Sequence, residues 1–100
     1  MSGTPIHVFA KWKVRPGQLE NVLSILKELK AKSVQEKGNL FYQVYQDNSD
    51  PNTLILFEAY SDDSALALHR NAGYYKQAVV ESISTLLTDR EVILTTPIDI

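Results

Sequence analysis

The sequence of 100 residues contains no cysteine, which excludes several kinds of chemistry at once. Disulfide bonds, thiolate metal sites and cysteine nucleophiles all require a thiol. The absence is typical of a reducing compartment, so we expect a cytoplasmic protein. Glycine is scarce too, with four residues. The GxGxxG, Walker and Gly-x-Ser-x-Gly motifs are missing, so neither a glycine-rich phosphate loop nor a serine-hydrolase elbow is expected.

Long apolar runs and clusters of basic residues are also lacking. No run approaches the roughly 18 residues that a membrane-spanning helix needs, and the N-terminus has no signal-peptide pattern. The ten Lys and Arg residues are scattered among twelve Asp and Glu residues, for a formal net charge of -2. A nucleic-acid-binding surface needs clustered positive charge. We therefore expect binding to neither membranes nor nucleic acid.

The pattern of apolar residues predicts a single domain over residues 1–100, with its core between about 6 and 97. Strands are predicted at 6–14, 39–46, 53–60 and 90–96, and helical segments at 18–36, 61–70 and 74–87. This β-α-β-β-α-β order is typical of an α+β, ferredoxin-like fold, with an antiparallel sheet and both helices on one face. Gly38 is the expected left-handed end of the first helix, and Ser61 the expected N-cap of the second.

Both faces of this sheet carry large apolar side chains, although the helices cover one face alone. Phe9, Ile55, Phe57 and Ile93 would share the uncovered face. An exposed apolar patch of this kind marks an interaction surface, and a domain this small gains stability from oligomerisation. We therefore predict a homodimer that pairs through this face, with the last strand and residues 97–100 reaching towards the partner.

The candidate catalytic residues lie between positions 57 and 76. Glu58 is near the end of a strand, and His69 lies on the helix that follows. His69 is the candidate base, because an imidazole accepts a proton near neutral pH. Glu58 is its candidate partner, because a carboxylate in an apolar layer needs a pairing group. The alternatives are a helix-end histidine that caps a carbonyl and a strand-end glutamate that pairs with Lys or Arg.

The candidate substrate-binding residues are aromatic, with one amide among them. Aromatic rings wall flat ligands, although rings at such spacing also form ordinary core. The set is Tyr60, Tyr75, Asn39, Trp12, Tyr42 and Tyr74. Asn39 opens a strand, where its amide donates to a substrate or caps a turn. His7 has the opposite strand parity from Trp12, so a two-histidine site with His69 is disfavoured and no metal is predicted.

Three segments carry a resemblance to a known family: residues 33–40 (SVQEKGNL), residues 57–60 (FEAY), and the stretch from His69 to Lys76. Over roughly residues 6–97 the chain resembles the antibiotic biosynthesis monooxygenase (ABM) domain. It is closest to the short branch that includes quinol monooxygenases and the isomerase of phosphorylated autoinducer-2. Gly73 stands where the family often has proline. The resemblance implies a dimeric α/β-barrel assembly with a pocket between sheet and helices.

The same resemblance bears on cofactors. Many family members are thought to oxygenate aromatic or quinol-like substrates without flavin, haem or metal, so no cofactor is expected. A haem-degrading branch shares the fold but relies on Asn, Trp and His. Ala10, Tyr60 and Val79 occupy those three places here, so haem oxygenation is not expected.

Three functions therefore remain open. The leading hypothesis is a cofactor-independent monooxygenase of a small aromatic, quinol or enol-type substrate, which His69 deprotonates before the anion reduces molecular oxygen. The alternative enzyme is an isomerase of a small hydroxy-ketone, with Lys76 and Arg70 as candidates for holding a phosphate. The third is a small-ligand-binding dimer without catalysis. The fold alone does not decide between them.

Overall fold

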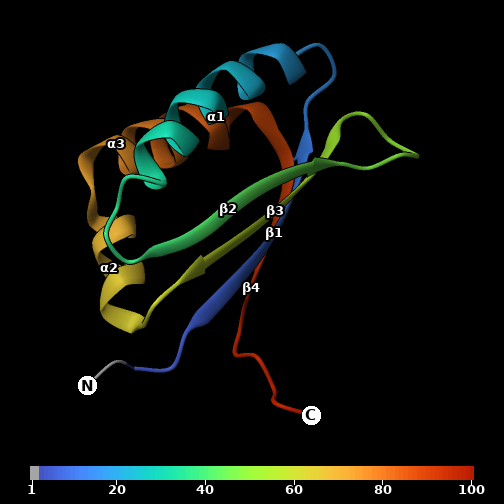
Figure 1. The fold of residues 1–100 in the computed structure, drawn as a ribbon. Helices are drawn as coiled ribbons and strands as arrows, with labels where there is room; N and C mark the ends of the chain where they lie inside the picture. Colours follow the sequence, from blue (N-terminus) through green and yellow to red (C-terminus); the bar gives the residue numbers. More distant parts are fainter. Residues whose placement is uncertain (1–2) are drawn as a thin grey trace.

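The structure, a computed structural model, describes residues 3–100 as a four-stranded antiparallel sheet with helices on one face (Figure 1). The strands are β1 (Ile6–Val14), β2 (Asn39–Gln46), β3 (Thr53–Tyr60) and β4 (Leu87–Thr95). Their order across the sheet is β2-β3-β1-β4, with every neighbouring pair antiparallel. This arrangement confirms the predicted ferredoxin-like fold. None of the helices in the described part of the chain is long and apolar enough to cross a bilayer.

Strands β1, β2 and β3 have the predicted bounds because their side chains alternate between two faces. In β1, Val8, Ala10, Trp12 and Val14 are buried under the helices, whereas the side chains between them face the other side. Strand β4 begins at Leu87, three residues earlier than predicted. Leu87 is buried and pairs with Val14 beyond an irregularity in the β1–β4 register, which extends the strand.

Helix α1 (Leu19–Ser33) ends earlier than predicted, and the expectation for Gly38 is wrong. Gly17 is the one residue with positive φ among residues 3–100, so Gly38 does not end a helix in the left-handed conformation. Gly38 instead lies in the turn between α1 and β2. A Cβ atom placed on Gly38 would lie 2.3 Å from the Cβ of Ala65 on the next helix. The glycine is therefore required for close packing of this turn.

Helix α2 (Asp63–Asn71) is capped by Asp62, so the prediction of Ser61 as N-cap is wrong. The Asp62 carboxylate accepts a hydrogen bond from the backbone N–H of Ala65 at 2.9 Å. Ser61 lies one residue before the cap position, and its N–H donates to the carbonyl oxygen of Gly38 at 2.9 Å. Ser61 thus continues the pairing of β3 with the chain before β2, and the helix begins one residue later.

After a break at Ala72, the chain forms three short helical segments rather than one regular helix. They are α3 (Gly73–Tyr75), the π-helix η1 (Lys76–Ser82) and the 3-10 helix η2 (Ile83–Leu86). The hydroxyl groups of Ser82 and Ser84 donate to the carbonyl oxygens of Gln77 and Val80, so they compete with the α-helical hydrogen bonds. A π-turn inside a helix is frequent at functional sites.

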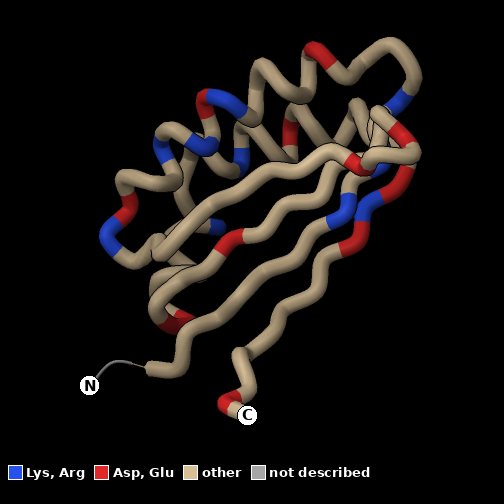
Figure 2. The backbone as a smooth tube through the Cα atoms, turned by 45° about the vertical axis from the view of Figure 1, so that its right-hand side comes forward, with Lys and Arg blue, Asp and Glu red and all other residues tan. Residues whose placement is uncertain are grey.

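The uncovered face of the sheet carries the predicted apolar patch. Phe9 pairs with Phe57 on one side and with Ile93 on the other, so these side chains share a face. The Phe9 and Phe57 rings stack with centroids 4.5 Å apart, yet Phe9 and Ile93 remain 38% and 51% exposed. Charged residues follow α1 and gather at one end of the sheet (Figure 2), whereas β2 has none and β3 has Glu58 alone.

Replacement of Gly38 by alanine tests the packing of the turn. We expect Gly38→Ala to lower the free energy of unfolding by about 1–3 kcal/mol, because the added methyl group meets Ala65. Urea denaturation measures the change. Gly73→Ala is the matched control, since nothing lies within 4 Å of its added Cβ and its φ is not positive. Equal stability of the two variants would contradict this account of Gly38.

Candidate active site

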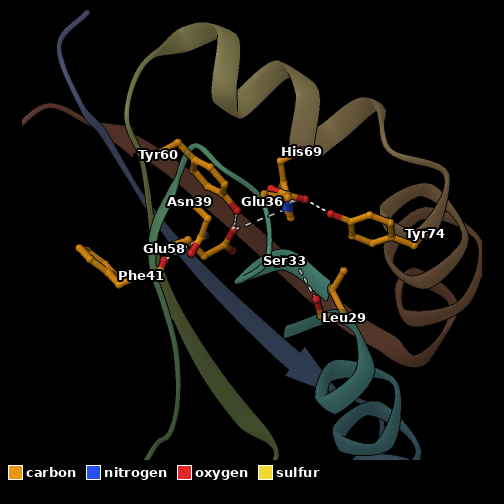
Figure 3. A network of polar contacts seen from close by, with 9 residues as sticks. All are labelled: Leu29, Ser33, Glu36, Asn39, Phe41, Glu58, Tyr60, His69 and Tyr74. Atoms are coloured by element: carbon orange, nitrogen blue, oxygen red, sulfur yellow. Dashed lines mark hydrogen bonds and ion pairs between the residues drawn. The ribbon is translucent and has the colours of Figure 1, made fainter. Parts of the chain in front are cut away.

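His69 is buried in the last turn of α2, between two carboxylate side chains (Figure 3). Its side chain is 2% exposed, and its Nδ1 atom lies 3.1 Å and 3.0 Å from the two carboxylate oxygens of Glu36. On the other side of the ring, Nε2 lies 3.8 Å from Oε1 of Glu58. One imidazole therefore connects the turn after α1 with strand β3.

Glu36 reaches His69 because the turn between α1 and β2 is tightly constrained. The Glu36 N–H donates to the Ser33 carbonyl, and the Glu36 carbonyl accepts from the N–H of Asn39, both at 3.1 Å. The Gly38–Ala65 contact holds this turn against α2. The hydroxyl of Tyr74 also donates to the Glu36 carboxylate. Glu36 is thus fixed by its own turn and by two neighbouring helices.

Sequence analysis missed Glu36, although it lies within the SVQEKGNL segment. A usable signal was present in the hairpin. Asn39 pairs with Tyr60, so the turn before β2 must lie beside the end of β3, where the candidate residues gather. A glutamate in that turn was therefore a candidate partner for His69.

Glu58 lies on the helix-covered face of β3 and is 8% exposed. Burial raises the pKa of its carboxyl group, and the Tyr60 hydrogen bond and the charge of His69 oppose this shift without reversing it. The Tyr60 hydroxyl donates to Oε1 of Glu58 at 2.7 Å. Burial, together with the nearby Glu58, raises the pKa of Tyr60 far above its usual range. Tyr60 therefore remains a hydrogen-bond donor at any physiological pH.

These contacts assign the protons of His69. An ionised carboxylate only accepts hydrogen bonds, so Nδ1 donates to Glu36, and in the neutral form of the ring Nε2 is the nitrogen without a proton. Nε2 faces Glu58, but their separation of 3.8 Å is too long for a hydrogen bond. The pair offers a base and a carboxyl group of raised pKa on the same side of the ring. That combination suits the removal and return of a proton.

A small cavity of about 20 Å³ lies beside the free side of His69. Such a volume holds one water-sized group. Its polar lining consists of Trp12, Tyr42, Glu58, His69, Arg70, Tyr75 and Arg90. The rest of the lining is aliphatic. Larger hollows lie between α1 and η1, at about 240 Å³, and against the start of α2, at about 470 Å³. Neither contains His69 or Glu58, so the small cavity is the one that both candidate catalytic residues line.

The structure brings together most of the predicted site residues but not all of them. Trp12, Tyr42 and Tyr75 line the cavity with the two candidate catalytic residues. Burial raises the pKa of the Tyr42 hydroxyl well above its usual value. The Tyr60 and Tyr75 rings lie 5.0 Å and 4.8 Å from the imidazole, measured between centroids.

Three predicted substrate-binding residues do not line the cavity: Tyr60, which bonds to Glu58, and Asn39 and Tyr74. The amide of Asn39 donates to the carbonyl oxygen of Phe41 at 3.2 Å, which matches the structural alternative for this residue. Tyr74 faces the groove between α1 and η1 and bonds to Glu36. Tyr74 therefore touches the site through Glu36 rather than through the cavity.

The site does not have the arrangement of a metal centre. Glu36 and Glu58 approach opposite nitrogens of His69, so the three groups do not converge on one point. Within residues 3–100, no cluster of three or more His, Asp or Glu side chains is positioned to hold a metal ion. His7 lies on the opposite face of the sheet, where its ring contacts Phe41 and Phe57.

Fold and site together define a small α+β domain with a buried histidine between two carboxylates. The family model described as "Antibiotic biosynthesis monooxygenase" matches residues 5–81, and the chain belongs to this ABM family.

The relatives of the chain differ in what they are named for. An isomerase of (4S)-4-hydroxy-5-phosphonooxypentane-2,3-dione from Salmonella paratyphi B is 32% identical over 75 residues, which span 75% of this chain and 77% of the isomerase. A solved protein from Mycobacterium tuberculosis has a TM-score of 0.89 and 27% identity, covering 96% of this chain and 97% of its own. A solved antibiotic biosynthesis monooxygenase has a TM-score of 0.88 and 26% identity, covering 94% and 99%.

The raised pKa of Glu58 predicts a pH-dependent gain in stability for Glu58→Gln. The ordinary pKa of a glutamate is 4.5. As the pH rises above this value, the unfolded state releases the Glu58 proton, whereas the folded state retains it to higher pH. The free energy of unfolding of the native protein therefore falls as pH rises through this window, by about 1.4 kcal/mol per unit of pKa difference. Glutamine accepts the Tyr60 hydrogen bond without a charge.

We expect Glu58→Gln to be more stable than the native protein at pH 8, and the difference to shrink below pH 4.5. Urea denaturation at pH 4 and pH 8 measures it. The exposed Glu28, changed to glutamine, is the control and should show no such trend. A larger advantage at pH 4 than at pH 8 would reverse the sign and refute the assignment.

Proposed function

We propose that this protein is an enzyme in which Nε2 of His69 removes a proton from a small oxygenated substrate, and that its reaction is the isomerisation of a small hydroxy-ketone. The arrangement of His69 between Glu36 and Glu58 carries this proposal. An isomerase takes a proton from one carbon and returns one to its neighbour. This task needs a base that removes and returns a proton, and no electron acceptor; the raised pKa of Glu58 favours the protonated form of a carboxyl group beside that base.

The proposed steps follow from these contacts. Nε2 takes the proton of the carbon that bears the hydroxyl group, and the electron pair moves towards the adjacent carbonyl, which becomes an enediolate. Glu36 accepts the Nδ1–H and stabilises the imidazolium that forms. His69 then returns the proton to the former carbonyl carbon. The proton of the substrate hydroxyl group moves to the former carbonyl oxygen, beside Glu58, so that the hydroxyl carbon becomes the new carbonyl. The atoms and electrons of the substrate are conserved.

The similarity to the Salmonella isomerase supports this reaction class. A second candidate, the cofactor-independent monooxygenase, is supported by the ABM family match. Both candidates share the first step, because deprotonation by His69 also converts a phenol, quinol or enol into an electron-rich anion. They differ in whether that anion is reprotonated or donates electrons to molecular oxygen.

Replacement of His69 by glutamine tests the shared step. Dihydroxyacetone phosphate in D₂O, without oxygen, serves as the isomerase probe, and NMR follows the exchange of its carbon-bound protons. Menadiol with an oxygen electrode serves as the monooxygenase probe. We expect exchange with the native protein and a loss of about 100-fold or more in His69→Gln, because a positioned general base contributes on that order.

The control for this experiment is Lys27→Gln, an exposed change on α1 that should leave the rate unaltered. Oxygen uptake with menadiol, lost in His69→Gln, would favour the monooxygenase instead. Exchange at the native rate in His69→Gln would refute the role of His69. Inactivity of the native protein towards both probes would favour the non-catalytic, ligand-binding alternative.

We also propose that a second copy of the chain covers the apolar sheet face in a dimeric α/β-barrel assembly. This face is centred on Phe9, Phe57 and Ile93 and lies opposite the helices. It reaches the edge strand β4 through Ile93, whereas the exposed Val92 and Leu94 of β4 lie on the other face of the sheet, opposite Ala10 and Val8. An edge strand of this composition requires cover to avoid non-specific association.

A charge placed in this face should dissociate the dimer. We expect the native protein to sediment at twice its chain mass of 11.3 kDa, and Ile93→Glu to shift to one chain mass because a carboxylate is costly to bury unpaired. Analytical ultracentrifugation measures both. Leu68→Glu is the control, since Leu68 is 74% exposed on α2. A native monomer, or dissociation by the control variant alone, would disprove the proposed interface.

A further inference from the structure

We propose that the cavity beside His69 recognises an anionic ketone: Trp12 Nε1–H binds its carbonyl oxygen, and Arg70 and Arg90 bind its carboxylate or phosphate at the cavity mouth. This inference rests on the proposed function and extends it by assigning a substrate class and the residues that select it. Trp12 was a sequence candidate for substrate contact and Arg70 for phosphate binding, whereas Arg90 is added by the structure.

The first observation is the unpartnered indole of Trp12. Its side chain is 3% exposed, and within residues 3–100 its Nε1 is the one buried side-chain nitrogen or oxygen without a hydrogen-bond partner. A buried donor without an acceptor destabilises the folded state, because its lost hydrogen bond to water is not replaced. Trp12 also lines the cavity. A hydrogen-bond acceptor entering that cavity would remove this cost.

The second observation is the size of the cavity. A volume of about 20 Å³ accepts one oxygen atom with little else, and an aromatic ring does not fit inside it. The acceptor for Trp12 is therefore a single projecting oxygen, such as that of a ketone. The remainder of the ligand must extend through the mouth of the cavity.

The third observation is the pair of arginines that line the same cavity. Arg90 lies opposite Trp12 in the β1–β4 register, so both side chains leave the sheet on the same face. Arg70 follows His69 directly on α2 and is half-buried, whereas Arg90 is exposed. Neither guanidinium forms an ion pair or a side-chain hydrogen bond with any residue from 3 to 100. Two unpaired guanidinium groups that line one cavity suit a carboxylate or phosphate.

The position of Trp12 also fits the chemistry. Trp12 and His69 line one cavity that is large enough for a single small group, so a carbonyl oxygen at Trp12 brings the adjacent carbon close to the base. Negative charge develops on that oxygen as the proton leaves. A fixed N–H donor in a water-poor site stabilises such a charge. Trp12 would thus act on the reacting group itself, whereas the arginines would set the orientation of the ligand.

Binding measurements with three small ketones test this assignment. Dihydroxyacetone phosphate, pyruvate and dihydroxyacetone supply a phosphate, a carboxylate and no charge, respectively. Trp12 is the sole tryptophan, so its fluorescence reports on the cavity, and calorimetry gives the affinities. We expect at least one anionic ketone to change the emission and to bind at least tenfold more tightly than dihydroxyacetone. Comparison of the affinities for dihydroxyacetone phosphate and pyruvate shows whether the site prefers a phosphate or a carboxylate.

Variants separate the two parts of the site. We expect Arg70→Gln and Arg90→Gln each to weaken binding of the anionic ketone by about tenfold or more, since a hydrogen bond to a charged group contributes on that order. Binding of dihydroxyacetone should not change in these variants. Trp12→Phe should weaken both ketones by about fivefold in calorimetry. Lys27→Gln, which removes one positive charge from the exposed face of α1, is the matched control.

Unchanged affinity in both arginine variants, or dihydroxyacetone binding as tightly as the anionic probes, would overturn the inference. The absence of detectable binding by either anionic probe at millimolar concentration would do so as well. His69→Gln keeps these outcomes distinct from those of the proposed function. Binding that depends on the arginines, without proton exchange by the native protein, counts against the isomerase alone. If proton exchange on dihydroxyacetone phosphate is as fast in both arginine variants as in the native protein, the isomerase proposal stands and the recognition of an anionic ketone is refuted.

Discussion

The structure depends on the burial of one ionisable side chain, His69, between two carboxylates. An imidazole that is 2% exposed needs polar neighbours, because unpaired buried polar groups destabilise the folded state. Three elements meet to supply them. The turn after α1 supplies Glu36, strand β3 supplies Glu58, and the capped start of α2 fixes the helix that carries His69. The close Gly38–Ala65 contact is the packing condition that lets the first of these elements approach the third.

Stability alone does not explain this arrangement. Buried ion pairs are often no more stabilising than apolar residues of similar volume, because desolvation offsets their attraction. Several departures from ordinary packing also lie around the same cavity: a carboxyl group of raised pKa, an indole without an acceptor and, beside them, the π-helix η1. The other large buried side chains of the core, such as Leu26, Leu54 and Ile83, have none of these features. Local departures from packing rules concentrate at functional sites.

Much of the fold was predictable because its signals are local. The alternation of side chains between two faces predicted the bounds of β1, β2 and β3. The order of strands and helices along the chain predicted the topology of the sheet. The errors arise where tertiary contacts override local preference. Gly38 serves packing rather than a left-handed helix end. Ser61 is bonded to the turn before β2, and Asp62 caps α2. His69 and Glu58 were found because strand parity and helix spacing point them inwards. Glu36 was missed because its position follows from a turn packed against a helix almost thirty residues later.

The β1–β4 register also determines which charged side chains of β4 face the cavity. Strand β4 lies at the edge of the sheet, and its residues alternate in charge: Arg90 stands between Asp89 and Glu91. Since neighbouring residues of a strand face opposite sides, a slip of one position would exchange the guanidinium for a carboxylate. A carboxylate would then stand where we propose that an anionic ligand binds. The irregularity between Lys13 and Val14, together with the buried Leu87, fixes the register that places Arg90 on the side of the cavity.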